Sequence, residues 1–202
     1  MAYSEQDRSE IRDRIALRCA ELIAEKGLSG VSGRSLAAHM KQSVGWIYNF
    51  HPDFDAVVLA ANSITLRELD ERLSHTAREH SGRTVSERFL ALALTYLRFS
   101  LDNPYRWAAL FEHRMPEGRD ISLEHKQEHY VLFRHVEAPL SEIMPGIDEI
   151  TLRATARTIY SAVHGVVSLS LESRLDRVPL ETLEDQLRRL TTAFARGFAT
   201  TA

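Results

Sequence analysis

The sequence predicts an all-α fold of about nine helices, in which a small three-helix unit precedes a larger helical domain. Apolar residues recur three and four positions apart along most of the chain, which is the spacing of one helix face. Alternating apolar and polar runs rich in β-branched residues, the pattern of half-buried strands, do not occur. Turn-forming pairs such as Asn103-Pro104 and Val178-Pro179 separate the helical stretches.

The composition is that of an ordinary globular protein. The 202 residues are 44% hydrophobic and 26% charged, which suits one large or two small domains. A single cysteine, Cys19, excludes a disulfide framework and a cysteine-based zinc site, and it fits a reducing cytoplasm. The first residues are charged, and no apolar run reaches the roughly 18 residues of a membrane span. We therefore expect a cytoplasmic protein with no signal peptide and no membrane partner.

The first three helices are predicted from apolar stripes and caps. A stripe that begins at Ile11 ends at Gly27, where a glycine can terminate the helix. Ser32 and Ser43 can each cap a short helix. These two helices are expected at about 33–40 and 44–50. So short a separation is typical of a helix-turn-helix, whose second helix faces the major groove of DNA.

A long fourth helix is predicted to begin near Asp53, which can act as its N-cap. The domain boundary is placed at this point, between residues 53 and 54. The remaining helices are expected at about 84–101, 104–113, 122–144, 148–175 and 179–200.

Local charge favours a polyanionic partner, although the net charge of −3 does not. The segment from Lys26 to Pro52 contains no Asp or Glu, but it contains Arg34 and Lys41. The chain on either side of this segment is rich in acidic residues. Because carboxylates repel phosphates, an acid-free basic segment is where a nucleic acid would be tolerated.

The second short helix carries the residue types that DNA contact needs. Gly45 lies in its first turn, where a side chain would hold the backbone away from DNA, and Ser43 beside it can bind a phosphate. Tyr48 can direct its hydroxyl to another phosphate, and Trp46 faces outward if Ile47 faces inward. The predicted DNA-binding residues are Ser32, Arg34, Lys41, Ser43, Val44, Gly45, Trp46, Tyr48 and Asn49.

Residues 8–57 resemble the DNA-binding domain of the TetR family of bacterial transcriptional repressors. The resemblance rests on Gly27, on Ser32-Gly33-Arg34-Ser35-Leu36-Ala37 and on Ser43-Val44-Gly45-Trp46-Ile47-Tyr48-Asn49-Phe50-His51. The family pattern has a glycine where Lys41 stands, which predicts backbone strain if φ is positive there. It has an aromatic residue at His51, a lysine at Phe54 and a small residue at Trp46. Base specificity therefore cannot be carried over from the family.

The resemblance implies that residues 1–53 form the helix-turn-helix domain and that residues 54–202 bind an effector and dimerise. Residues 158–169 resemble the Trp-x-x-Val-His-Gly element of one effector-domain subgroup, with Tyr160 in the Trp place, and residues 103–116 resemble the segment before it. An apolar pocket for a small hydrophobic effector is expected from aromatic side chains and one histidine. The candidates are Tyr96, Phe99, Trp107, Phe111, Tyr130, Phe133, Tyr160 and His164.

A homodimer is expected because one helix-turn-helix reads only half of a palindromic operator. Apolar stripes on the last two helices could form a four-helix interface. Its predicted residues are Leu152, Ile159, Val163, Val166, Leu187, Leu190, Phe194 and Phe198. Gly165 costs roughly 1 kcal/mol against Ala inside a helix, so another helix is expected to approach it closely.

The main interpretation is a repressor that a small ligand releases from DNA. The ligand would favour a conformation in which the two helix-turn-helix units of the dimer are wrongly spaced for the operator. A DNA-bound activator and a regulator without a ligand are alternatives that the sequence leaves open. A remote alternative is a zinc-dependent hydrolase, because His125, Glu128 and His129 spell an H-x-x-E-H signature. Otherwise no catalytic residue, resident metal or cofactor is expected.

Overall fold

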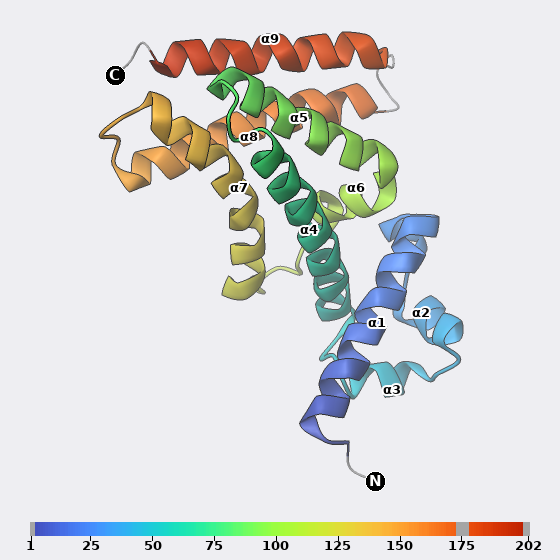
Figure 1. The fold of residues 1–202 in the computed structure, drawn as a ribbon. Helices are drawn as coiled ribbons and strands as arrows, with labels where there is room; N and C mark the ends of the chain where they lie inside the picture. The colour runs from blue at the N-terminus through green and yellow to red at the C-terminus, as the bar shows by residue number, and fades with distance from the viewer. Residues whose placement is uncertain (1–2, 173–177, 200–202) are drawn as a thin grey trace. The chain divides into compact units, whose positions relative to one another are not determined.

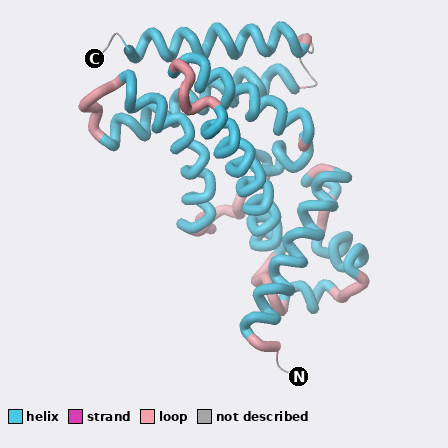
Figure 2. Tube along the Cα trace, in the orientation of Figure 1, coloured by secondary structure: helices cyan, strands magenta, loops and turns pink. Residues whose placement is uncertain are grey.

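The computed structural model describes residues 3–172 and 178–199, and within these ranges the chain is helical without any strand, as predicted (Figure 1, Figure 2). Nine α-helices and one 3₁₀ helix lie in the described ranges. They are α1 (Glu5–Lys26), η1 (Leu28–Gly30), α2 (Gly33–Met40), α3 (Val44–Tyr48), α4 (Phe54–Glu79), α5 (Val85–Asp102), α6 (Pro104–Glu112), α7 (Leu123–Ile143), α8 (Glu149–Leu171) and α9 (Leu180–Ala199). The predicted ends of the last two helices, at 173–175 and at 200, lie outside the described residues.

The predicted caps are present. Ser32 Oγ accepts the N–H of Ser35 at 3.2 Å, and Ser43 Oγ accepts that of Trp46 at 3.1 Å. Asp53 Oδ1 accepts the N–H of Ala56 at 2.9 Å at the start of α4. Each bond satisfies a helix N–H that has no partner within its own helix, which is why helices begin at these residues.

The described residues divide into two compact units. The first takes in the residues up to Glu68 together with Phe99–Glu128, and the second takes in Leu69–Arg98 together with the residues from His129 onward. Helices α4, α5 and α7 contribute residues to both units. The predicted functional boundary after residue 53 is a separate matter and stays a prediction.

The core of the first unit holds the helix-turn-helix together. Ile15 from α1, Leu36 from α2 and Ile47 from α3 are fully buried in one cluster with Val57 from α4. A helix of five residues is not stable alone in water, so α3 depends on this tertiary burial. Figure 1 shows α2 and α3 beside α1.

In the second unit, helices α8 and α9 lie side by side (Figure 1). Phe89 of α5, Leu140 of α7, Ile159 of α8 and Ala195 of α9 are buried in one cluster there. Within the described parts of both units, no helix is long and apolar enough to cross a membrane.

Candidate nucleic-acid interface and effector cavity

The first turn of α3 is accessible to solvent at Gly45. Gly45 is exposed, and a Cβ built on it would meet no atom within 4 Å among the described residues, apart from its chain neighbours and the backbone of its own helix. Ser43, its neighbour before the helix, is also exposed. The N–H groups of Val44 and Gly45 precede the first intrahelical bond and can therefore donate to an outside acceptor. Packing among the described residues therefore does not require a glycine at position 45.

The side chains of α3 after Gly45 are divided between the core and the surface. Trp46 is half-buried, and its ring centre lies 5.0 Å from that of Phe50, so the expectation that it faces outward is met only in part. Tyr48 is 40% exposed. Its hydroxyl oxygen lies 2.6 Å from the position that a Cβ on Gly33 would take. Gly33 therefore leaves room for Tyr48 at the N-terminus of α2.

The remaining predicted DNA contacts lie mostly at the surface. Exposed side chains are those of Ser32, Arg34, Lys41, Ser43 and Asn49, while that of Val44 is half-buried. Lys41 ends α2 with φ 55° and ψ 41°, so the strained left-handed conformation expected at this position is present.

Arg8 of α1 holds the end of α3, which the sequence did not indicate. Its guanidinium donates to the carbonyl oxygen of Asn49 at 2.7 Å and lies over the Phe50 ring, 5.2 Å from the ring centre. The ring of Tyr3 packs edge-on against Phe50 at 5.4 Å. A cation at a helix C-terminus satisfies carbonyls that have no intrahelical partner. Arg8 is thus a positioning residue for α3.

The two residues after α3 that differ from the family pattern, His51 and Phe54, pack inside the first unit. His51 is buried, its Nε2 lies 3.4 Å from the carbonyl oxygen of Arg12, and burial lowers the pKa of its imidazole. Phe54 is partly buried and packs against the core cluster of α1 and α2. Neither residue replaces the phosphate-binding lysine that the family pattern has at position 54.

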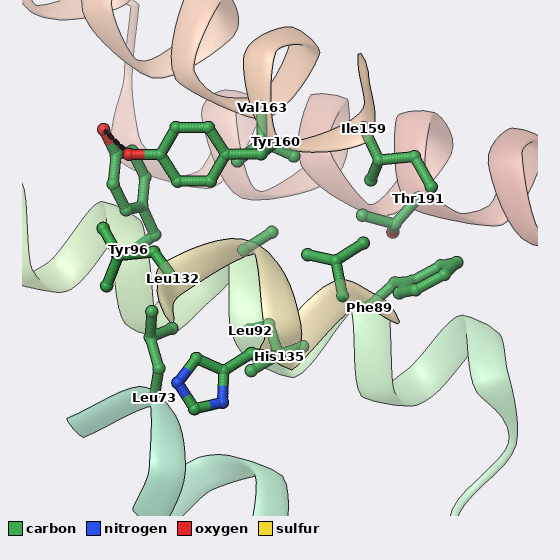
Figure 3. A pocket seen from close by; sticks show the side chains of 12 residues that line it. Leu73, Phe89, Leu92, Tyr96, Leu132, His135, Ile159, Tyr160, Val163 and Thr191 are labelled. Carbon is green, nitrogen blue, oxygen red and sulfur yellow. Dashed lines mark hydrogen bonds between the residues drawn. The ribbon is translucent and has the colours of Figure 1, made fainter. Parts of the chain in front are cut away.

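A narrow apolar cavity lies in the second unit, and five helices line it (Figure 3). Its walls are Leu73 of α4, Phe89, Leu92, Ala93 and Tyr96 of α5, Leu132, His135 and Val136 of α7, Ile159, Tyr160 and Val163 of α8, and Thr191 of α9. The cavity volume is about 30 Å³, which is room for about two water molecules.

Polar groups converge at one edge of this cavity. Tyr160 donates its hydroxyl to the hydroxyl oxygen of Tyr96 at 3.4 Å, drawn as a dashed line in Figure 3. The Tyr96 hydroxyl lies 2.7 Å from His164 Nδ1 and can donate to it when the imidazole is neutral. Burial lowers the pKa of His164 and raises the pKa of Tyr160 to about 12, so both groups favour their neutral forms.

Of the eight residues predicted for the pocket, Tyr96 and Tyr160 line this cavity. Phe133 packs against Tyr160 with ring centres 5.0 Å apart, and the half-exposed Tyr130 lies 6.0 Å beyond Phe133. The other three aromatic candidates belong to the first unit and do not line it; they are Phe99, Trp107 and Phe111.

Three residues assigned to the dimer interface need correction. Ile159 and Val163 line the cavity, and Leu187 has no exposed surface. Their side chains are buried within the chain itself, on the sides of α8 and α9 that face the core of their own unit. The half-buried candidates are Leu152, Val166, Leu190, Phe194 and Phe198.

The described residues do not show the expected close approach of another helix to Gly165. A Cβ built on Gly165 would meet nothing within 4 Å among the described residues.

The structure also brings together His135 Nε2 and Asp70 Oδ1, which lie 2.6 Å apart. The sequence did not indicate this contact, because the two residues are 65 positions apart.

The H-x-x-E-H segment makes hydrogen bonds instead of an open ligand set. Ser63 Oγ donates to Glu128 Oε2 and lies 3.0 Å from His125 Nδ1, and His125 Nδ1 lies 3.1 Å from Glu128 Oε2. His129 belongs to the other compact unit. The described residues contain no group of three or more His, Cys, Asp or Glu side chains that could hold a metal ion.

Solved structures share this fold. A protein of unknown function from Rhodococcus sp. RHA1 matches with a TM-score of 0.71 and 20% identity over 93% of this chain and 94% of that chain. A TetR-family transcriptional regulator from Streptomyces coelicolor matches with a TM-score of 0.70 and 18% identity, covering 100% and 85%. RolR in complex with resorcinol matches with a TM-score of 0.64 and 16% identity, covering 98% and 97%. No curated protein matches the chain significantly.

The sequence itself matches a protein family over residues 89–194, slightly more than half of its length. That family is described as "Tetracyclin repressor-like, C-terminal domain". The match covers α5 from Phe89 to most of α9, and the solved relatives share the all-helical arrangement. The narrower likeness to the Trp-His-Gly subgroup stays a prediction. The chain therefore belongs to the tetracyclin repressor-like family of regulators.

Proposed function

We propose that this protein is a sequence-specific DNA-binding transcriptional regulator, a repressor that a small hydrophobic ligand releases from a palindromic operator. The observation that carries the DNA-binding part is the first turn of α3. It is accessible, it lies in a segment without acidic residues, and a Cβ added to its Gly45 would meet nothing within 4 Å among the described residues outside its own helix backbone. A glycine exposed in a helix costs free energy, so its presence is best explained by the close approach of a ligand such as DNA.

The groups around this turn suit a phosphate backbone. The N–H groups at the start of α3, the hydroxyls of Ser32, Ser43 and Tyr48, and the cations of Arg34 and Lys41 all lie on accessible residues. Helix N-termini and such side chains bind phosphate oxygens and set the register of a protein on the duplex. Trp46 and Asn49 are then the residues that we assign to base edges and sugars.

A homodimer supplies the second helix-turn-helix that a palindromic operator requires. A Cβ added to Gly165 of α8 would meet open space among the described residues, so a helix of a second copy is the neighbour that would account for this glycine. Ile150 is 82% exposed and Leu169 is 62% exposed on the same helix. We propose an interface built from the outer faces of α8 and α9 and the half-buried Leu152, Val166, Leu190, Phe194 and Phe198.

The apolar cavity of the second unit is the proposed effector site. RolR, a structural relative, was solved with its ligand resorcinol. A cavity of about 30 Å³ is too small for a ligand of that kind, so a ligand has to move the walls apart. Leu73 is one of those walls and belongs to α4, which continues without a break to Phe54, next to the helix-turn-helix. Ligand binding would thus favour a second conformation of α4, with operator affinity as the readout.

The substitution Gly45→Ala tests the DNA-binding part. Because the added methyl meets nothing in the protein and Ala is a better helix former, the free energy of unfolding should stay equal or rise by up to about 1 kcal/mol. Operator affinity should fall at least about tenfold, since the methyl would hold the backbone away from the phosphates. Binding is measured by fluorescence anisotropy on the palindrome found by footprinting next to the gene.

Gly82→Ala, in the turn between α4 and α5, is the control, because a methyl there also meets nothing within 4 Å among the described residues and Gly82 lies outside both proposed sites. Its operator affinity should equal that of the natural protein. An operator affinity of Gly45→Ala that also equals the natural value would contradict the proposed role of α3.

A further inference from the structure

A second cavity adjoins the first in the same compact unit, and its walls are chemically different. It has a volume of about 90 Å³ and is lined by nine residues from the end of α4 and the turn after it, the start of α5 and the second half of α7. Four of the nine are Arg88, Arg134, His80 and His135, and none is acidic. Nitrogen donors without lining carboxylates suit an anion.

Donors remain available in this second cavity. Arg134 is exposed, and its side chain makes no ion pair or hydrogen bond with any described residue. Arg88 is largely buried and bonds to Glu142 through Nη1 at 2.6 Å, so its other guanidinium N–H groups can serve a second acceptor. His80 uses Nδ1 for the carbonyl oxygen of Thr76 at 3.0 Å, and His135 is held by Asp70.

The two cavities share a wall. Leu92 and His135 line both of them. Figure 3 shows His135 and Leu73 along one edge of the first cavity, with Tyr160 and Ile159 across from them. A movement of the Leu92 and His135 side chains would join an almost wholly apolar space to a cationic one.

From this juxtaposition we propose that the effector is a small amphipathic carboxylic acid. Its apolar body occupies the cavity bounded by Tyr160 and Val163, and its carboxylate binds Arg134 and Arg88 in the second cavity. The assignment rests on the proposed function of the first cavity as an effector site. A purely apolar ligand would leave the arginine pair unused, and a simple inorganic anion would leave the apolar cavity unused.

The test compares octanoate with 1-octanol, which has the same apolar chain but no charge at pH 7. Binding to the full-length protein is measured by isothermal titration calorimetry. The double variant Arg88→Gln/Arg134→Gln should bind octanoate roughly tenfold or more weakly, the loss typical of charge-assisted hydrogen bonds. Its affinity for octanol should be unchanged, and this second measurement shows that the variant is folded.

Arg157→Gln on the exposed face of α8 is the control for a change in net charge, and octanoate should bind it as it binds the natural protein. Val163→Ile should weaken octanoate and octanol alike, because its extra methylene occupies the first cavity. Equal binding of the two probes, an equal loss of affinity in Arg157→Gln, or no binding of octanoate would each overturn the carboxylate assignment.

The proposed function is measured separately, through operator binding and its weakening in Gly45→Ala. If octanoate fails to bind but the operator results stand, only the assignment of the ligand class is wrong. If octanoate binds through the arginine pair but leaves operator affinity unchanged, the carboxylate site stands and release by that ligand is refuted.

Discussion

Lys41→Gly should make the protein more stable and bind DNA less well. Lys41 adopts φ 55° and ψ 41° at the C-cap of α2, where its N–H donates to the carbonyl oxygens of Ala37 and Ala38. This left-handed conformation brings Cβ close to the carbonyl that follows it, and glycine has no Cβ. Lys41 is also one of the few cations in the acid-free segment from 26 to 52.

The two effects have different magnitudes. Relief of the left-handed strain stabilises the folded state by about 1–2 kcal/mol. Glycine offsets part of this, because its greater freedom favours the unfolded chain by about 0.5–1 kcal/mol. The net gain is about 0.5–1 kcal/mol, or about 1–4 °C in Tm for a chain of this size. If Lys41 binds a phosphate, removing its charge makes the plot of the logarithm of the operator association constant against the logarithm of salt concentration less steep, by about 0.9.

Urea unfolding and operator titrations at several salt concentrations measure these two quantities. Lys41→Ala is the matched control, because it removes the charge and keeps the Cβ. It should show the same reduced salt slope as Lys41→Gly without the gain in stability. A glycine variant no more stable than the alanine variant would refute the strain argument. A salt slope unchanged in both variants would refute the binding of a phosphate by Lys41.

Two further substitutions test other parts of the structure. Leu187→Ala should lower the free energy of unfolding by about 2–5 kcal/mol, because Leu187 has no exposed surface within the chain, whereas Arg189→Ala on the exposed face of α9 should leave it unchanged. A Leu187 variant that only dissociates, without losing stability at high protein concentration, would restore that residue to the interface. His51→Phe should reduce the loss of stability between pH 7 and pH 5. Burial lowers the pKa of His51 in the folded protein, so the stability that its neutral imidazole contributes is complete above the unfolded pKa of about 6.5. This stability is lost as the pH falls toward the lower pKa of the folded state. Equal pH dependence in the two proteins would show that His51 does not titrate in this range.

Most of the helical architecture could be predicted from the sequence, because its signals are local. The caps at Ser32, Ser43 and Asp53 each act on an N–H three residues away, and the strain at Lys41 was expected because the family pattern has a glycine at that position. The bare first turn of α3 could also be predicted, since Gly45 stands in a segment that has no acidic residue. Such features depend on neighbours within about one helical turn.

The sites built from distant segments were predicted poorly. Apolar stripes on α8 and α9 indicated that a face is buried, but not that Ile159, Val163 and Leu187 pack inside their own chain. Aromatic residues were assigned to one pocket, although Trp107 and Phe111 belong to a different compact unit from Tyr160. Periodicity identifies the buried side of a helix and carries no information about what covers it.

The sequence by itself determined where most helices begin and end, and the family that the chain resembles. Only the tertiary structure decided that Arg8 holds the end of α3, that His135 meets Asp70, and that an apolar cavity shares a wall with a cationic one. The physical reason is range: caps and helix periodicity act over three or four residues, whereas these contacts join residues 41 and 65 positions apart, which only the packing of whole helices brings together.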